Sequence, residues 1–288
     1  MKDLYPVCGI SKQAHFKARR QALMREGIEQ QVVSSAAALR EAHPAMGCRK
    51  MYQVLGEQLA VGRDRFESIL LNNGFRVRFP RNYVKTTRSF KGRGFDNLIS
   101  GKRLDGIDQV WQSDIAYIKV ADRYYYLVFV VDVYSRRILG YQVNHHMLAT
   151  ANIKALKQAI HQRGKQVFDG LIHHSDRGAQ YIDKRYIQLQ RDHHITTSMA
   201  KHCWENAYVE RVNGIIKNEY LRPMELKTER ALQAALKRVV WLYNNQRPHL
   251  SLPDKMTPVN FEKALEANYN KPTLTIYNSQ QQAQLINS

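Results

Sequence analysis

The sequence predicts an α/β domain built on a five-stranded mixed sheet with flanking helices, preceded by a small helical segment. Apolar and alternating patterns separated by short turns predict three consecutive strands at 109–120, 124–133 and 137–144. Shorter apolar runs at 171–174 and 195–198 alternate with helical periodicity, and the first is typical of a buried parallel strand. Because some strands are joined by turns and others through helices, the sheet is expected to be mixed in direction.

The first 75 residues are expected to form a helical, helix-turn-helix-like DNA-binding segment. Ser11 is expected to cap a helix that ends near Ala22, and a second helix is expected at 28–41. Two further helices, at 49–59 and 63–71, are joined by Ala-Val-Gly, a tight turn that suits a helix-turn-helix. A helical cap without a DNA role is the alternative, but basic residues on the exposed phases favour DNA contact. These residues are Arg49, Lys50, Arg63 and Arg65.

Residues 76–105 are interpreted as a basic linker. Between 76 and 103 the chain carries nine Lys or Arg and one acidic residue, with glycines and aromatic residues interleaved. This composition suits a segment that becomes ordered along a phosphate backbone, and a solvated spacer is the alternative. The candidate DNA contacts here are Arg88, Lys91 and Arg93.

Three helices, expected at 149–163, 183–192 and 206–221, complete a core assigned to residues 106–225. Three meandering strands followed by helix, strand, helix, strand and helix are the element order of the ribonuclease H-like fold. Residues 226–268 are expected to extend this core with helices. The tail at 269–288 is rich in Gln and Asn and is expected to be poorly ordered.

The charge balance points to a polyanionic partner. The chain carries 44 Lys or Arg against 25 Asp or Glu, a formal net charge of +19. Such an excess favours nucleic acid, because neutralised phosphates release their counterions. A basic housekeeping protein, for instance one bound to ribosomes, is the alternative.

Other features narrow the class of protein. The longest apolar run, 124–133, is too short to span a membrane and the N-terminus has no signal-peptide pattern, so a cytoplasmic protein with no membrane partner is expected. The three scattered cysteines form no disulfide framework. The His-His pairs lack the cysteine partners usual in a zinc site, so zinc is not expected.

Three carboxylates lie at the edges of predicted elements. Asp114 lies in a strand whose other phases are apolar, where a carboxylate is costly unless a metal or cation is close. Asp176 directly follows the strand at 171–174, at the strand end where open α/β sheets place ligands. A salt-bridged core Asp and a turn-forming Asp are the respective alternatives.

Helical phase singles out the third acid. On the helix from Asn206, positions 206, 210, 213 and 217 share a polar face that reads Asn, Glu, Asn, Lys. Glu210 is the carboxylate of that face, and Lys217 suits a phosphate beside it. Magnesium prefers oxygen ligands together with substrate phosphates, so carboxylates in a basic chain predict a metal site for a polyanion.

Other titratable residues are given ordinary roles. Asp132 is expected to form an ion-paired turn with Arg136 and Arg137. Glu205 and Glu219 are expected to serve the helix dipole or face solvent. His174 could orient substrate or water near Asp176, and a structural histidine is the equal alternative.

Five motifs together carry a family resemblance. They are Trp111-Gln-Ser-Asp114-Ile-Ala-Tyr117, Val131-Asp-Val-Tyr-Ser-Arg136, His174-Ser-Asp176-Arg-Gly-Ala-Gln-Tyr181, Glu205-Asn-Ala-Tyr-Val-Glu210 and Tyr243-Asn-Asn-Gln-Arg-Pro-His249. Over residues 8–265 the chain resembles the DDE transposases of the insertion-sequence-three family, specifically the second-reading-frame protein. That group belongs to the retroviral-integrase superfamily.

This resemblance implies an integrase catalytic core in which Asp114, Asp176 and Glu210 are both the catalytic triad and the metal ligands. It implies two Mg²⁺ ions, with Mn²⁺ as a substitute, and DNA strand cleavage followed by strand transfer at element ends. Lys217, Arg177 and the polar-face residues Asn206 and Asn213 are the expected DNA contacts of the core. One departure is the spacing, since thirty-three residues separate Asp176 from Glu210 and the family commonly has thirty-five.

The resemblance also implies partners. The first is double-stranded DNA, both the terminal inverted repeats of the element and the target DNA. The second is a further copy of the chain, in a homo-oligomeric synaptic complex. The third is a first-reading-frame helix-turn-helix and coiled-coil protein, possibly as a fusion. A ribonuclease H-like nuclease without strand transfer and a non-catalytic DNA-binding regulator are the alternative functions.

Overall fold

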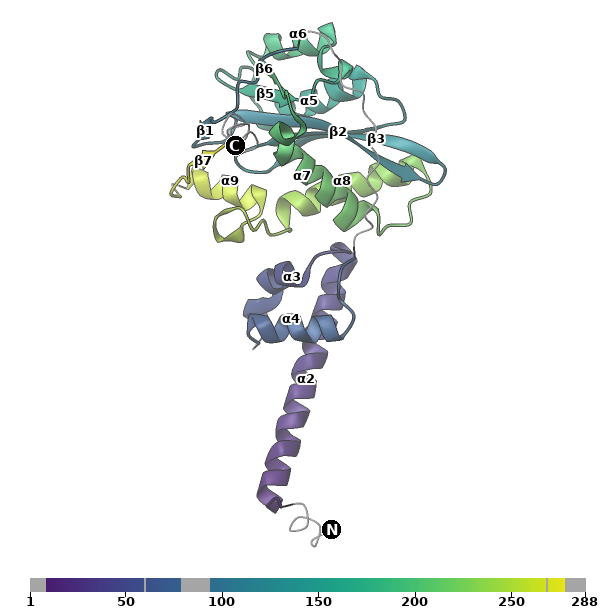
Figure 1. Cartoon of the computed structure of the whole chain (residues 1–288), viewed down its shortest axis with the longest axis vertical. Helices are drawn as coiled ribbons and strands as arrows, with labels where there is room; N and C mark the ends of the chain where they lie inside the picture. Colours follow the sequence, from purple (N-terminus) through teal and green to yellow (C-terminus); the bar gives the residue numbers. More distant parts are fainter. Residues whose placement is uncertain (1–8, 60, 79–93, 268, 278–288) are drawn as a thin grey trace, which may run out of the picture. The chain divides into compact units, whose positions relative to one another are not determined.

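The computed structural model of the chain describes residues 9–59, 61–78, 94–267 and 269–277. The chain divides into two compact units, Met1–Phe79 and Pro80–Ser288. The elements of both are labelled in Figure 1.

The first unit begins with a single long helix. α2 (Lys12–Ala42) is continuous, so the expected break near Gly27 is wrong. A glycine costs a helix interior roughly 0.5–1 kcal/mol but does not prevent the helical conformation. Nothing lies within 4 Å of a Cβ built at Gly27, so the position is open as well as helical. Ser11 caps the helix as expected, because its side-chain oxygen accepts a hydrogen bond from Ala14 N.

Two short helices pack on the second half of α2. They are α3 (Cys48–Leu55), which continues into the 3₁₀ turn η1 (Gly56–Gln58), and α4 (Arg63–Asn72). Their shared core includes Val32, Ala36, Met51, Phe66 and Leu70. The helical character of this segment is as expected, and its helix-turn-helix role stays a prediction.

The second unit is built on a five-stranded sheet in the order β4-β3-β2-β5-β6. The strands are β2 (Val110–Val120), β3 (Arg123–Asp132), β4 (Ile138–Asn144), β5 (Ile172–Ser175) and β6 (Thr196–Met199). β2, β3 and β4 pair antiparallel, whereas β5 pairs parallel with both β2 and β6. The mixed sheet with its ribonuclease H-like element order is therefore confirmed.

Helices cover both faces of the sheet, as Figure 1 shows. α5 (Ala149–Arg163) and α6 (Lys184–Asp192) lie on one side, and α7 (Ala207–Ile215), α8 (Glu229–Asn245) and α9 (Pro258–Glu266) lie on the other. α7 continues into the π-helical turn η4 (Ile216–Leu221), so the helix expected at 206–221 changes its winding halfway. Short 3₁₀ turns complete the unit: η2 (Ala179–Tyr181), η3 (Cys203–Asn206) and η5 (Pro253–Lys255).

The core between the sheet and α5 is closely packed. Trp111, Val130 and Leu156 are fully buried there. Gly140 of β4 allows the closest approach, because a Cβ built on it would lie 1.9 Å from the carbonyl oxygen of Ala155. Gly140 therefore lets α5 pack directly against β4.

Part of the expected disordered tail is ordered. β7 (Leu274–Thr275) pairs antiparallel with β1 (Arg103–Leu104). Ile276 is buried, and the Tyr134 hydroxyl donates a hydrogen bond to Pro272 O at 2.7 Å. The expectation of poor order is therefore wrong for the described residues up to 277, because a few apolar side chains in a polar segment find partners on the core. Residues 278–288 lie outside the described part of the chain.

Candidate active site

Asp114 lies on β2 opposite helix α7. Its side chain is half-buried, and its Oδ2 accepts a hydrogen bond from Asn213 Nδ2 at 2.7 Å. Two residues earlier, Gln112 fixes the start of α7 to the same strand. Its Oε1 accepts from Tyr208 N and Val209 N, each at 3.2 Å. The distance between Asp114 and α7 is thus set by buried polar contacts.

Asp176 immediately follows β5, at the carboxyl end of that strand. Its Oδ1 accepts a hydrogen bond from Gly178 N at 3.0 Å, so the side chain stabilises the turn that it begins. A Cβ built on Gly178 would lie 3.0 Å from this same oxygen and 2.8 Å from Gln180 Oε1. A larger residue there would have to displace the ends of these two side chains. Asp176 is half-buried and keeps its second carboxylate oxygen for other partners.

Glu210 lies on α7, one turn before Asn213, and its side chain is exposed. The loop before α7 is fixed by Glu205, whose Oε2 accepts from Lys201 N and His202 N. Gln112 Nε2 also donates to the carbonyl oxygen of Glu205 at 3.1 Å. The helical phase expected for Glu210 is confirmed, because Val209 and Val212 are buried on the opposite side.

The three acids influence one another electrostatically. Burial and, to a lesser extent, the charges of Asp176 and Glu210 together raise the pKa of Asp114 to about 8. Burial likewise raises the pKa of Asp176. Although Glu210 is exposed overall, partial shielding of its carboxylate from water and the charge of Asp176 raise its pKa. Asp114 and Asp176 directly follow Ser113 and Ser175, which are paired between β2 and β5, and Glu210 lies on the helix that Asn213 bonds to Asp114. We call these three carboxylates the acid cluster.

The donor chemistry of this cluster fits a hard divalent cation, which would neutralise the repulsion between the carboxylates. In the conformation described, however, the described residues contain no group of three or more His, Cys, Asp or Glu side chains already arranged around a metal position. The assignment of all three acids as ligands of the same metal centre stays a prediction.

Lys217 joins this cluster from η4. Burial and the charge of Arg222 lower its pKa, whereas the charge of Asp114 raises it. Its Nζ lies 5.0 Å from the ring centroid of Tyr117. Arg177, next to Asp176, is half-buried. Both basic residues thus lie near the acids, and their expected contacts with DNA phosphates stay a prediction.

Two expected DNA contacts have another role. Asn206 and Asn213 are buried, with 2% and 4% of their surface exposed. Asn206 Nδ2 donates to Ser113 O at 3.1 Å, and Asn213 donates to Asp114. The expectation that they contact DNA is wrong for this conformation, because these amides satisfy buried acceptors on β2. They position α7 and the Asp114 side chain.

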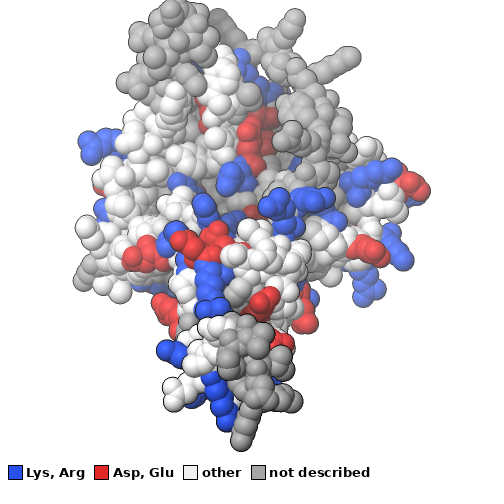
Figure 2. Space-filling model, turned by 60° about the horizontal axis from the view of Figure 1, so that its bottom comes forward, with Lys and Arg blue, Asp and Glu red and all other residues white. Residues whose placement is uncertain are grey.

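The basic residues of the first unit are mostly exposed. Arg63 and Arg65 lie on the surface of α4, and Arg49 is exposed beside Glu67, at 3.5 Å, whereas Lys50 is half-buried. Their DNA contacts remain predictions. Arg88, Lys91 and Arg93 fall outside the described residues. On the face drawn in Figure 2, basic side chains are spread widely with acidic ones among them. On this face, charge alone does not mark a single DNA path.

Asp132 has a different ion partner from the one expected. It is fully buried, and Arg163 Nη2 lies 3.4 Å from its Oδ2. Arg136 instead lies over the ring of Tyr208, and Arg137 pairs with Glu262. The turn at Asp132 itself is as expected, because Oδ1 accepts from Ser135 N at 2.8 Å.

Two further expectations concern Glu219 and His174. Glu219 is paired with buried Arg247 through two hydrogen bonds of 2.8 and 3.0 Å, so a role in solvent is wrong.

His174 is fully buried, its Nδ1 lies 2.9 Å from Ser198 Oγ, and burial lowers its pKa to about 4. A neutral histidine hydrogen-bonded to the neighbouring strand β6 favours a structural role for His174 over one in orienting substrate or water.

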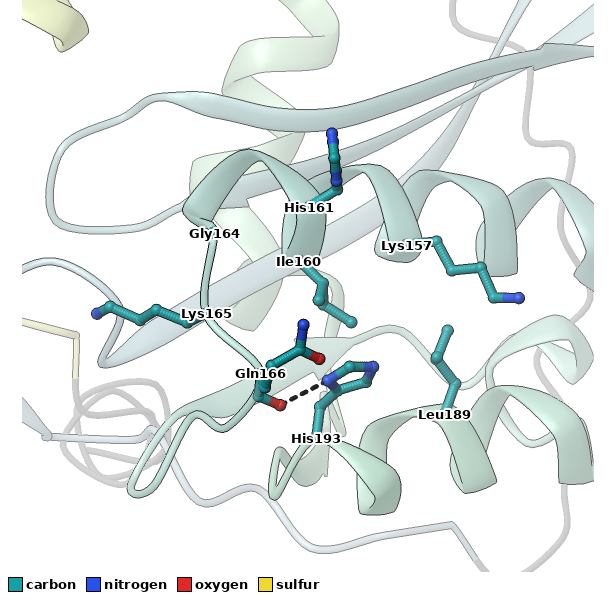
Figure 3. Close-up of a pocket in the computed structure, with 8 residues that line it drawn as sticks. All are labelled: Lys157, Ile160, His161, Gly164, Lys165, Gln166, Leu189 and His193. Carbon is teal, nitrogen blue, oxygen red and sulfur yellow. Dashed lines mark hydrogen bonds between the residues drawn. The ribbon is translucent and has the colours of Figure 1, made fainter.

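A separate pocket between α5 and α6, drawn in Figure 3, has no part in this cluster. Its lining includes Lys157, Ile160, Leu189 and His193, and it contains no carboxylate side chain. It lies where α5 ends, before the start of β5, whereas Asp176 follows the end of that strand.

Two family models described as integrase core domain match the chain, at residues 106–202 and 192–258. The chain is 30% identical over 223 residues to the insertion element IS600 31 kDa protein of Shigella sonnei, covering 75% of this chain and 81% of that protein. The chain belongs to the DDE transposases of the retroviral integrase superfamily.

Other relatives agree with this family. The chain is 28% identical to the transposase for insertion sequence element IS629 of Shigella sonnei, and the match covers 81% of this chain and 79% of the relative. It is 27% identical to transposase InsF of insertion sequence IS3A of Escherichia coli, covering 67% and 68%. Among solved structures, it is similar to the HTLV-2 integrase catalytic core domain in complex with magnesium, with a TM-score of 0.44, 24% identity, and coverage of 58% of this chain and 99% of that one.

The family, enzyme class and transposase function predicted from the sequence are thereby confirmed. The matched stretches of this transposase contain Asp114, Asp176 and Glu210. Sequence reasoning missed the positioning role of Gln112. Its signal was a second polar side chain on the same strand phase as Asp114. No helix among the described residues is both long and apolar enough to cross a membrane.

Proposed function

We propose that this transposase cleaves and joins DNA strands at the ends of an insertion sequence, with Asp114, Asp176 and Glu210 holding two Mg²⁺ ions, or Mn²⁺ as a substitute. The observation that carries the proposal is the placement of these three acids in a chain of formal net charge +19. Asp114 and Asp176 follow paired residues of neighbouring strands, and Glu210 lies on the helix that Asn213 bonds to Asp114. Like charges gathered on three elements are costly without a cation. The bound ions would activate the attacking oxygen and stabilise the leaving one.

The chain's own residues prepare the site. Asn213 donates to Asp114 and keeps its carboxylate oriented toward α7. Gln112 and Asn206 anchor the start of α7, so Glu210 is presented at a fixed distance from β2. Lys217 and Arg177 would hold phosphate oxygens by charge, which positions a strand without reading its sequence.

The test is metal-dependent joining of a labelled element end to plasmid DNA by wild type and by Glu210→Gln. We expect joined products from wild type with Mg²⁺ or Mn²⁺, and none above background from the variant. Equal joining by both would remove Glu210 from the assignment. Cleaved but never joined products would favour a ribonuclease H-like nuclease, and activity in neither protein would favour a DNA-binding regulator.

We further infer the wider assembly. The partners would be terminal inverted repeats and target DNA, a second copy of the chain across two ends, and a first-reading-frame helix-turn-helix and coiled-coil protein, free or fused. The transposase family of the relatives supports this. The bacterial origin of the relatives supports a cytoplasmic, nucleoid-associated localisation of this protein. Binding of labelled ends with and without the co-expressed first-frame protein tests it; equally tight and specific binding by this chain alone would contradict the need for that partner.

A further inference from the structure

A groove of about 320 Å³ lies along the second half of β2, the strand that carries Asp114 in its first half. It is formed where β2 ends, where β3 begins and where the chain leaves η4. Two tyrosine rings, Tyr117 and Tyr124, and two cations, Lys119 and Arg222, line it, and Leu221 and Leu226 supply apolar surface. Aromatic rings interleaved with cations are the surface that proteins use for unpaired nucleic acid.

Lys217 connects the groove with the acids. It lies in η4, which continues the helix that carries Glu210 and leads into Leu221 and Arg222 of the groove. Its Nζ lies 5.0 Å from the ring centroid of Tyr117, the residue three positions after Asp114 on β2. A strand whose phosphate lies against Lys217 beside the acids therefore has the groove next to it.

The two rings contact each other. Tyr117 and Tyr124 make an edge-to-face contact with centroids 6.0 Å apart and planes at 61°. Tyr124 stands on β3, opposite Lys119 in the register with β2, so its backbone is fixed by the ladder. Its side chain is nevertheless 54% exposed. An exposed aromatic ring that lines a cationic groove offers a surface on which a base can stack.

We propose that this groove binds one unpaired nucleotide of the DNA strand next to the acids, with its base stacked on Tyr124 and its phosphate held by Arg222 and Lys119. The proposal rests on the proposed function, because it concerns the DNA that this site acts on. A base inside a duplex has both faces covered by its neighbours, so it cannot stack on a protein ring. The groove therefore distinguishes unpaired DNA from paired DNA without reading the base.

The first test uses the full chain in EDTA, so that no metal-dependent reaction takes place. An oligothymidylate carrying one 5-iododeoxyuridine is irradiated with the protein, either single-stranded or annealed to oligodeoxyadenylate. Cross-linked peptides are then mapped by mass spectrometry. We expect cross-links at Tyr124 or Tyr117 from the single strand and few from the duplex. Cross-links found only elsewhere, or equally from both forms, would overturn the proposal.

The second test measures binding of the same two DNA forms by fluorescence anisotropy. We expect Tyr124→Ala to weaken single-strand binding roughly fivefold or more, with a clearly smaller effect on the duplex. Tyr124→Phe keeps the ring and should bind like wild type. Tyr277→Ala is the matched control, because Tyr277 is also 54% exposed and lies outside the groove. Equal affinities of Tyr124→Ala and wild type for the single strand would contradict stacking.

Arg222→Ala tests the phosphate contact. The slope of log K against log salt for the single strand should become shallower by about 0.7, the value for one lost contact; an unchanged slope would contradict the assigned contact. Binding in EDTA and joining with metal are separate measurements. If Glu210→Gln loses joining but Tyr124 makes no contact with the single strand, the groove proposal is wrong and the catalytic assignment stands. If Tyr124 binds the single strand but Glu210→Gln still joins DNA, the catalytic assignment is wrong and the groove proposal stands.

Discussion

Asp114→Asn should stabilise the metal-free protein above neutral pH. The substitution removes one negative charge but keeps the shape of the side chain and an oxygen that can accept from Asn213 Nδ2. The pKa of Asp114 is raised from 3.8 to about 8 by burial and by neighbouring carboxylates. A carboxyl group whose pKa is raised on folding destabilises the folded state as pH rises from its unfolded value to its folded value.

The magnitude follows from this shift. Four pH units correspond to roughly 5–6 kcal/mol for an isolated group at about 1.36 kcal/mol per unit. Asp176 and Glu210 titrate with Asp114 and share the repulsion, so removing one charge recovers only part of it. We expect on the order of 2–3 kcal/mol near pH 8, which corresponds to about 4–12 °C in Tm for a domain of this size. Near pH 4 the difference should disappear.

The assay is thermal unfolding of the full chain in EDTA across this pH range, repeated with Mg²⁺. Asp122→Asn is the matched control, because Asp122 is a fully exposed carboxylate just after the same strand. Its Tm should follow wild type at every pH. Mg²⁺ should raise the Tm of wild type and of Asp122→Asn but not of Asp114→Asn. An Asp114→Asn protein that is no more stable than wild type at pH 8 would refute the reasoning.

Three further outcomes are expected. Arg163→Met leaves buried carboxylates without their cation and should cost about 3–5 kcal/mol in unfolding free energy, whereas Arg185→Met, at an exposed ion pair, should leave Tm unchanged. Gly140→Ala places a methyl group against a backbone carbonyl of α5 and should lower stability by about 1–3 kcal/mol, measured by urea unfolding. Asn213→Ala removes the donor that lowers the pKa of Asp114, so metal-dependent joining should need a higher pH; an unshifted pH profile would contradict the positioning role.

The sheet was predictable because its signals are local. Three turn-linked strands and two short apolar strands appear directly in the pattern, and the structure adds only their order. Glu210 was predictable for the same reason, since Val209 and Val212 fix the phase of its helix. Asp114 and Asp176 were recognisable from a carboxylate in an apolar strand and a carboxylate at a strand end.

Expectations failed where the deciding partner lies far away in sequence. Glu219 was expected to serve the helix dipole or face solvent, but it pairs with Arg247, which comes 28 residues later. Asn213 was expected to face DNA, and only the fold shows that Asp114, 99 residues earlier, takes its donor. In α2 the failure was of a different kind, because Gly27 weakens a helix locally without deciding whether its neighbours continue it. Long-range contacts such as Glu219–Arg247 and Asn213–Asp114 leave no periodic signal in the sequence.

The most direct test of the central claim is Mn²⁺ binding to the full chain, followed by the loss of the free-ion electron paramagnetic resonance signal. Wild type and Asp122→Asn should bind Mn²⁺ alike. Asp114→Asn, Asp176→Asn and Glu210→Gln should each bind it at least about tenfold more weakly, since each removes a proposed oxygen ligand. Mn²⁺ affinities equal to wild type in all three variants would contradict the claim that these acids form one metal site.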